Sequence, residues 1–153
     1  MRELPAAQRA DRPATRSGMG MLMITVYGIF AVASTARATY QVATKLDDAP
    51  VAYLLSALAA VLYVVATVAL LRATPRARTV AWTSVTVELV GVVGVGTLSF
   101  VRPELFPEAT VWSHLGEGYG YVPLVLPLLG LWWLARTRPG AGAPAPATPR
   151  PTP

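Results

Sequence analysis

The charged residue with the clearest chemical potential in this 153-residue chain is Glu88. Four apolar stretches divide the sequence, and Glu88, halfway through the third, is the charged residue that lies well inside one. An ionised carboxylate is costly in apolar surroundings, so Glu88 should be protonated, paired with another group or turned toward water. Such a carboxyl can bind and release a proton or hold a cation, which makes it a candidate functional residue.

Three further polar residues are expected to join Glu88. Ser84 precedes it by one helical turn, on a face of small and polar residues that recur at spacings of three and four. Tyr63 and Tyr27, in the second and first stretches, lie near the same depth on similar faces. Because small residues let apolar helices approach closely, we predict one buried cluster. Its role is open between a neutral link that fixes helix register, proton- or cation-coupled transport, and contact with another membrane subunit.

The densest group of functional side chains lies between residues 110 and 121. It contains His114 and Glu117, which together with Glu108 form a weak candidate for an external cation or proton site. Ser113 and His114 are adjacent, and sequence neighbours rarely face each other as a nucleophile and its base must. We expect a short interfacial helix from Thr110 to about residue 115, followed by a glycine hinge.

No motif for catalysis or for a cofactor accompanies these side chains. The alternating glycines of the same segment follow no strand, so they do not indicate a nucleotide-binding loop. With no Cys and one His, the chain lacks the ligands of a usual zinc or iron–sulfur site. We therefore expect no cofactor, no metal and no enzymatic activity.

Four apolar helices would position these residues. The stretches cover about 19–36, 51–71, 80–101 and 120–135. At about 1.5 Å per residue, the first three can cross a hydrocarbon core of about 30 Å, and the shorter fourth can cross where the bilayer thins. With 54% hydrophobic and 14% charged residues, the sequence predicts an all-α fold, a four-transmembrane-helix bundle within residues 17–138.

The charge distribution predicts how this bundle is oriented. Four crossings place ten of the 13 Lys and Arg residues on one side, in both tails and in the loop at 72–79. By the positive-inside rule, the N- and C-termini are cytoplasmic. The loops at about 37–50 and 102–119 instead collect acidic residues. Trp112, in the second of these loops, is expected in an interfacial aromatic belt.

The first stretch has an alternative interpretation as a cleaved signal peptide. It follows a basic segment, and Ala36-Arg37-Ala38 fits a cleavage site with small residues. However, its apolar part is longer than a usual signal peptide has, and helix-favouring residues continue to Lys45. We therefore expect it to remain as a span.

The two tails lie outside the predicted bundle. Residues 1–16 form a basic N-tail, and residues 139–153 form a Pro/Ala-rich C-tail, and both are expected to be disordered. The C-tail is either a passive solvated segment or a PxxP docking segment. The net charge of +5 comes from Arg residues around apolar stretches, so it indicates membrane orientation and contact with anionic lipid, and no nucleic-acid partner.

Five segments form a pattern across most of the chain: 40–45, 49–53, 88–92 (Glu-Leu-Val-Gly-Val), 110–113 (Thr-Val-Trp-Ser) and 118–134. In this pattern, over roughly residues 19–135, the chain resembles a group of uncharacterised actinobacterial integral membrane proteins with four helices. The resemblance implies a topology and no catalytic activity. The small multidrug transporters also have four helices and one membrane acid, but theirs lies in the first helix, whereas Glu88 lies in the third stretch.

These features predict a structural or accessory component of the bacterial cytoplasmic membrane. Heavy use of Ala, Val, Arg, Pro and Gly is typical of a bacterial genome rich in G and C. The expected partners are the lipid bilayer and either another membrane protein or a second copy of the chain. The alternative is a small proton-coupled transporter that acts as a homo-oligomer, with Glu88 as the coupling acid.

Overall fold

The computed structural model describes residues 18–72 and 74–137, and the tails predicted at 1–16 and 139–153 lie outside this part. All regular structure in the described residues is helical, as predicted. In chain order the elements are α2 (Gly18–Thr44), α3 (Pro50–Arg72), α4 (Pro75–Val101), the 3₁₀ segments η2 (Pro103–Leu105) and η3 (Ser113–Tyr119), and α5 (Val122–Arg136).

Helices α2, α3 and α4 are each long and apolar enough to cross a membrane. η3 and α5 meet the same criterion only as a pair, and they are bent by 101° relative to each other. Between residues 18 and 137, leaving out residue 73, there are thus three candidate spans, or four if the bent pair is one span. This confirms the prediction that several helices of this chain can cross a membrane.

The fourth predicted span, 120–135, differs from the structure. Gly120 and Tyr121 have positive φ angles of 61° and 60°, in the left-handed region, so the helix cannot include them. α5 therefore begins at Val122 and has 15 residues, a length of about 22 Å against a hydrocarbon core of about 30 Å. Hydropathy predicts one span here because it does not register a turn in the backbone.

The other helices extend beyond their apolar stretches. α2 continues to Thr44, past the predicted end at residue 36, and α4 begins at Pro75, before the predicted start at residue 80. Thr74 caps α4, because its Oγ1 accepts a hydrogen bond of 3.1 Å from the Ala77 amide, and Pro75 occupies the first turn. Capping residues decide where these helices begin, whereas hydropathy indicates only the part that can lie in lipid.

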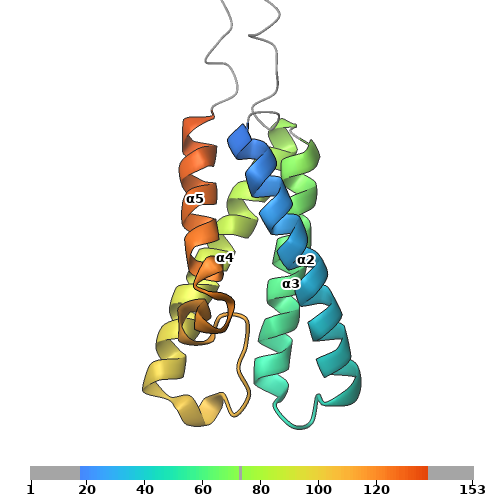
Figure 1. Ribbon diagram of the computed structural model, residues 1–153, viewed down its shortest axis with the longest axis vertical. Helices are drawn as coiled ribbons and strands as arrows, with labels where there is room; N and C mark the ends of the chain where they lie inside the picture. The colour runs from blue at the N-terminus through green and yellow to red at the C-terminus, as the bar shows by residue number, and fades with distance from the viewer. Residues whose placement is uncertain (1–17, 73, 138–153) are drawn as a thin grey trace, which may run out of the picture.

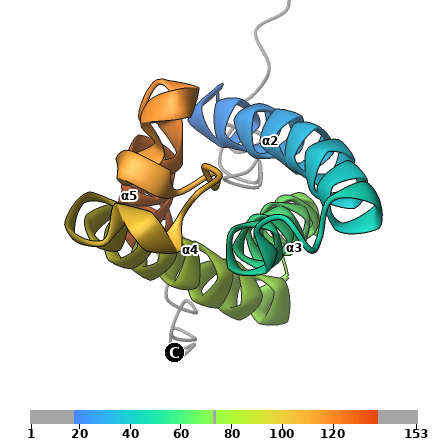
Figure 2. The same ribbon diagram turned by 90° about the horizontal axis from the view of Figure 1, so that it is seen from below.

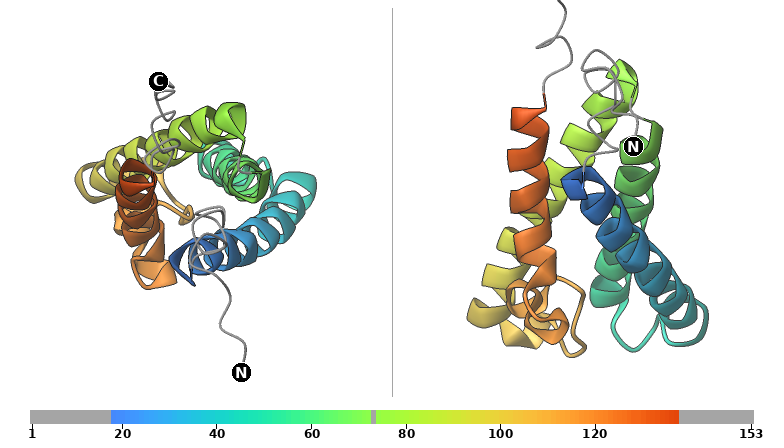
Figure 3. Two further views of the ribbon diagram at one scale, coloured as in Figure 1. Left: turned by 90° about the horizontal axis from the view of Figure 1, so that it is seen from above. Right: turned by 45° about the horizontal axis from the view of Figure 1, so that its top comes forward.

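The four helices stand around a common centre in chain order within the described part of the protein (Figures 1 and 2). α2 packs on α3, α3 on α4, and α4 on α5. The start of α2, the α3–α4 connection and the end of α5 lie at one end of the bundle, and the α2–α3 turn and η3 lie at the other (Figure 3). An interior enclosed by all four helices results.

Charge differs between the two ends of the bundle. We call the end with the α3–α4 connection the basic end; its described charged residues are Arg72, Arg76, Arg78 and Arg136. We call the opposite end the acidic end; it carries the acidic residues Asp47, Asp48, Glu104, Glu108 and Glu117 along with Arg37, Lys45 and Arg102. The two sides that the sequence distinguishes by charge are therefore the two ends of the bundle.

Small residues face the interior of the bundle and larger apolar residues face outward. On α3 the buried set includes Ala52, Ser56 and Ala59, whereas Leu54 and Val61 are more than half exposed. This pattern is the reverse of a water-soluble core, and it suits helices in lipid, where small residues allow close approach.

Arg78 joins α4 to α5 at the basic end. Its guanidinium donates hydrogen bonds to the backbone carbonyl oxygen of Leu134 and, at 3.4 Å, to Oγ1 of Thr137. The last carbonyl groups of a helix lack partners within the helix, and a basic side chain there provides one. The contact fixes the end of α5 against the start of α4.

Candidate functional site

Glu88 occupies the middle of the bundle. It is the central residue of the 27-residue helix α4, and its side chain is 0% exposed. It lies on the inward face of α4 with Ala81 and Ser84 on the turns before it. Ser84 is buried, but among the described residues no hydrogen bond links it to Glu88. Glu88 is thus held away from both ends of the helix.

Tyr27 and Tyr63 bring phenol groups to the same place from α2 and α3. Both side chains are 0% exposed, and the hydroxyl groups of both interact with the Glu88 carboxyl. Their ring centroids are 6.2 Å apart, and the ring of Phe30 lies 5.5 Å from that of Tyr63. The structure therefore brings together, from three helices, the Tyr27, Tyr63 and Glu88 that the sequence placed at one depth.

Trp112 is a fourth member of this cluster, although the sequence predicts it in an interfacial belt. Its side chain is 1% exposed, and its indole interacts with the Tyr63 hydroxyl. The expectation that Trp112 lies in an interfacial belt is therefore wrong. The reason is that the segment between η2 and η3 does not stay at the surface but turns into the space between the helices (Figure 2). We call Tyr27, Tyr63, Glu88 and Trp112 the polar core.

The polar core contains hydrogen-bonding groups that have no regular partner. Among the described residues, no hydrogen bond of regular geometry forms to Tyr27 Oη, Tyr63 Oη, Trp112 Nε1 or either carboxyl oxygen of Glu88. The two phenols can both donate and accept, so they can solvate Glu88 in its ionised or its protonated form, while the indole can donate only to the Tyr63 hydroxyl. Chemically, the arrangement can hold a proton at Glu88 or make a set of hydrogen bonds that joins the helices.

Residues 106–121, which we call the inserted loop, hold Trp112 in place through a compact turn. The Thr110 amide donates to Ser113 Oγ at 2.9 Å, and the Ser113 amide donates back to Thr110 Oγ1 at 2.9 Å. The Trp112 amide donates to the same Thr110 hydroxyl at 3.0 Å. The interfacial helix predicted from Thr110 to about residue 115 does not form as a regular helix, because only the 3₁₀ segment η3 begins at Ser113 and the φ angles of His114 and Leu115 are positive.

Two glycines of α4 receive the inserted loop. A Cβ at Gly91 would lie 2.7 Å from two ring carbons of Trp112, and a Cβ at Gly96 would lie 2.6 Å from Leu115 Cδ2. His114 and Leu115 have positive φ angles of 50° and 60°, and the His114 amide donates to Ser99 Oγ at 2.8 Å. The loop can pack this closely because α4 has no side chain at these two positions.

Arg37 ties the inserted loop to the opposite side of the bundle. Its guanidinium donates to the Tyr119 hydroxyl and, at 3.3 Å, to the backbone carbonyl oxygen of Ala109. The Tyr119 ring also lies 6.2 Å from Phe30, which contacts Tyr63. A chain of aromatic contacts therefore leads from Arg37 at the acidic end to the polar core.

The residues proposed for an external cation site are not brought together. The His114 ring packs edge-on against Phe100 at 4.8 Å, while Glu108 and Glu117 are exposed. The described residues contain one ion pair, between Arg102 and Glu104, and no group of three His, Asp or Glu side chains that could hold a metal ion. The Arg102 guanidinium holds the pKa of the exposed Glu104 carboxyl below its usual range.

The sequence contains a signal for Trp112 that periodicity alone did not reveal. Gly91 lies on the Glu88 side of α4, one turn farther along, and a glycine there leaves room for a large ring. Thr110 and Ser113, three residues apart, are a pattern that side-chain-to-backbone hydrogen bonds favour in turns. Together these residues indicate a structured loop that packs against α4.

Comparisons of the chain with protein families, with curated proteins and with solved structures found no match. The resemblance to uncharacterised actinobacterial membrane proteins therefore stays a prediction. What can be inferred about function rests on the polar core, the inserted loop and the charge at the two ends.

Proposed function

We propose that the chain is a multi-pass integral protein of the bacterial cytoplasmic membrane, with both termini in the cytoplasm. Two observations support this orientation. The described charges at the basic end are all Arg, and the five acidic residues of the loops gather at the opposite end. The positive-inside rule then puts the basic end in the cytoplasm.

Reporter fusions test this orientation. Fusions after Arg76 and after Arg138 should report a cytoplasmic position, and a fusion after Glu108 should report an external one. If the fusion after Arg76 reported outside, the orientation would be wrong. If the fusions after Glu108 and Arg138 reported the same side, α5 with η3 would be a re-entrant segment, and the bundle would cross the membrane three times.

Within that membrane the chain acts as a structural or accessory component and has no catalytic activity of its own. The observation that carries this proposal is the burial of Glu88 against Tyr27 of α2 and Tyr63 of α3, with Trp112 of the inserted loop packed on the Tyr63 side. Hydrogen-bonding groups that meet inside a membrane bundle hold helices together, with an average of about 0.6 kcal/mol for each bond. Glu88 serves this purpose as a neutral acid.

A small proton-coupled transporter is the second candidate, with Glu88 as the coupling acid. The specific observation in its favour is that the hydrogen-bonding atoms of the polar core have no regular partner among the described residues. A site that gains and loses a proton keeps spare donors and acceptors, and an isolated intramembrane acid is a common proton carrier. Because Glu88 is enclosed within one bundle, access from both sides would need an assembly of more than one copy.

Copurification from native membranes separates the two candidates. The tagged chain is extracted in mild detergent, and the mass and composition of the complex are measured. A different membrane protein in fixed stoichiometry supports the accessory role. A homodimer or homotetramer alone, together with pH-driven flux in vesicles that Glu88→Gln abolishes, would overturn it and support transport.

A further inference from the structure

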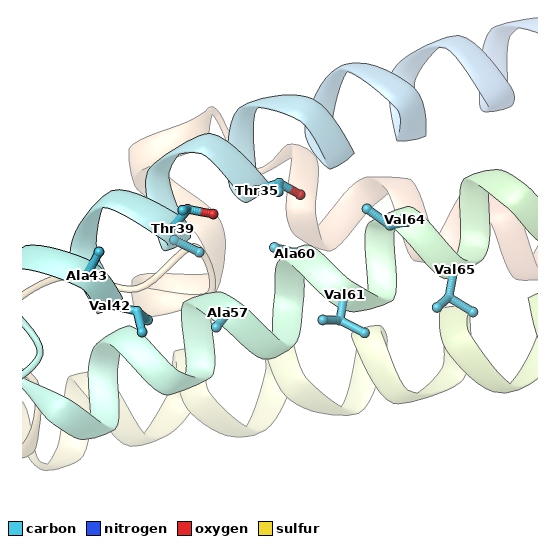
Figure 4. A pocket seen from close by; sticks show the side chains of 10 residues that line it. Thr35, Thr39, Val42, Ala43, Ala57, Ala60, Val61, Val64 and Val65 are labelled. Carbon is cyan, nitrogen blue, oxygen red and sulfur yellow. The ribbon is translucent and has the colours of Figure 1, made fainter.

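The outward face of α3 carries two hollows that meet. The first, of about 520 Å³, lies between α2 and α3 and is lined mainly by Ala and Val side chains, with Thr35 and Thr39 on α2 and Val64 and Val65 on α3 (Figure 4). The second, of about 300 Å³, lies between α3 and the start of α4 and is lined by Val64, Val65, Val68, Ala69, Arg72, Ala77 and Val80. Val64 and Val65 line both, so the hollows adjoin along α3, and we refer to them together as the groove.

The groove has the dimensions and polarity of a lipid site. From Val64 to Arg72 it follows eight residues of α3, which is about 12 Å along the helix and so close to the depth of one leaflet, half of a hydrocarbon core of about 30 Å. Over this length its walls are the side chains of Val and Ala, and Arg72 in the last turn of α3 ends it. An apolar channel with a cation at the membrane surface matches an acyl chain below an anionic headgroup.

Arg72 has no partner for its charge among the described residues, so it can bind an anion. Within residues 18–72 and 74–137, neither Arg72 nor Arg76 makes a hydrogen bond or an ion pair, whereas Arg78 contacts α5 and Arg136 lies 4.5 Å over the Trp132 ring. The exposed acidic residues of the described chain lie at the opposite end of the bundle. A second copy packed side by side would therefore bring no described acidic side chain to Arg72, but a phospholipid brings a phosphate.

We propose that this groove binds an anionic glycerophospholipid. One acyl chain lies along α3 between Val80 and Val64 and continues into the α2–α3 hollow, and the phosphate of the headgroup contacts the Arg72 guanidinium. Arg is suited to phosphate because its planar guanidinium donates two parallel hydrogen bonds. The site does not depend on Glu88, so it holds whether the chain is an accessory protein or a transporter.

The contact between Arg72 and the headgroup is tested with phosphatidylglycerol and phosphatidylcholine that carry a photoreactive group in one acyl chain. Each is mixed at the same low fraction into phosphatidylcholine nanodiscs that contain the purified chain, and the crosslinked residues are mapped. Phosphatidylglycerol should label the groove more than phosphatidylcholine does. Arg72→Gln should reduce that labelling about fivefold, the effect of one basic side chain near a membrane surface, while Arg76→Gln, which lies outside the groove, should leave it nearly unchanged. Equal losses in both variants would mean general attraction to a basic surface, and would overturn the proposal.

Binding of the acyl chain is tested with a variant that fills the groove. Val68 is 38% exposed, so Val68→Phe places a ring in the second hollow without entering the core. It should abolish the labelling, whereas the matched variant Val87→Phe, on the outward face of α4 and not in the groove, should retain it. The mass of each variant in detergent is measured as well. If Val68→Phe retained the labelling, the groove would not be a lipid site. If Val68→Phe converted an oligomer to a monomer, the groove would instead be a contact between copies of the chain.

Discussion

The indole ring of Trp112 lies directly against Gly91. A Cβ at position 91 would be 2.7 Å from Cη2 and Cζ3 of that ring and 3.0 Å from Cε3, closer than non-bonded carbon atoms approach. The inserted loop can therefore enter the bundle this deeply only because α4 has no side chain at position 91. This contact connects a loop at the acidic end to the helix that carries Glu88.

Gly91→Ala should destabilise the protein even though alanine favours helix. The gain in helix propensity is at most about 1 kcal/mol, whereas the indole is rigid and forced overpacking costs about 1–3 kcal/mol. We expect a net loss of about 1 kcal/mol, measured as unfolding in mixed micelles. Gly94→Ala is the matched control, because a Cβ there meets nothing within 4 Å. Equal stability of the two variants would show that Trp112 does not pack on Gly91.

The indole N–H of Trp112 is buried and makes no hydrogen bond of regular geometry among the described residues, so its removal should matter less than removal of the ring. Trp112→Phe keeps most of the apolar contact and should change stability by less than about 1.5 kcal/mol. Trp112→Ala leaves a cavity and should cost about 3–5 kcal/mol. Unfolding in micelles measures both. A large loss in Trp112→Phe would indicate that the N–H makes a hydrogen bond that holds the polar core.

Three members of the polar core could be predicted from sequence, but the fourth, Trp112, could not. Tyr27, Tyr63 and Glu88 lie on helices, where a spacing of three or four residues fixes the face and the distance from the end fixes the depth. Trp112 lies in a segment without periodicity, and its position depends on hydrogen bonds between Thr110 and Ser113 and on contact with Gly91. Such tertiary contacts leave no regular pattern in the sequence.

The same reason explains why the start of the last apolar stretch, 120–135, differs from the prediction. The run from 120 to 135 has the hydropathy of a span, and its composition gives no sign that Gly120 and Tyr121 adopt left-handed backbone angles. Glycine favours this conformation but tyrosine does not. The sequence therefore indicated a hinge at a glycine, whereas the turn also includes Tyr121.

Arg37 should control how firmly the inserted loop is held. Arg37→Gln removes the donors to the Tyr119 hydroxyl and to the Ala109 carbonyl, and because the guanidinium is exposed the cost in stability should be below about 1 kcal/mol. Hydrogen exchange of residues 106–121 should nevertheless become faster, since the loop loses its hydrogen bonds to α2, although the ring contact between Tyr119 and Phe30 remains. Arg102→Gln is the control, because Arg102 pairs with the neighbouring Glu104. Unchanged exchange in Arg37→Gln would show that the other contacts of the loop hold it without Arg37.

Substitution of Glu88 should show what the carboxyl contributes to stability. Glu88→Gln keeps the shape and most of the hydrogen-bonding capacity, so a neutral linking role predicts little change in expression or in stability in detergent. Glu88→Ala removes the partner of Tyr27 and Tyr63 and leaves a small void, which should cost about 1–2 kcal/mol. A loss in Glu88→Gln as large as that in Glu88→Ala would contradict the neutral role, because it would mean that the charge itself stabilises the bundle.

Infrared spectroscopy should show directly whether Glu88 exchanges its proton. Between about pH 5 and 9 exposed carboxyl groups are mostly ionised, and the other acidic residues of the described chain are exposed. The difference between the spectra of the unsubstituted protein and Glu88→Gln then isolates the protonated C=O band of Glu88. If Glu88 links the helices as a neutral acid, this band should persist unchanged across the whole range, because an ionised carboxylate is costly at this depth. If it disappears and returns reversibly with pH, a purely structural role is excluded and the proton-coupled alternative gains the titrating acid that it requires.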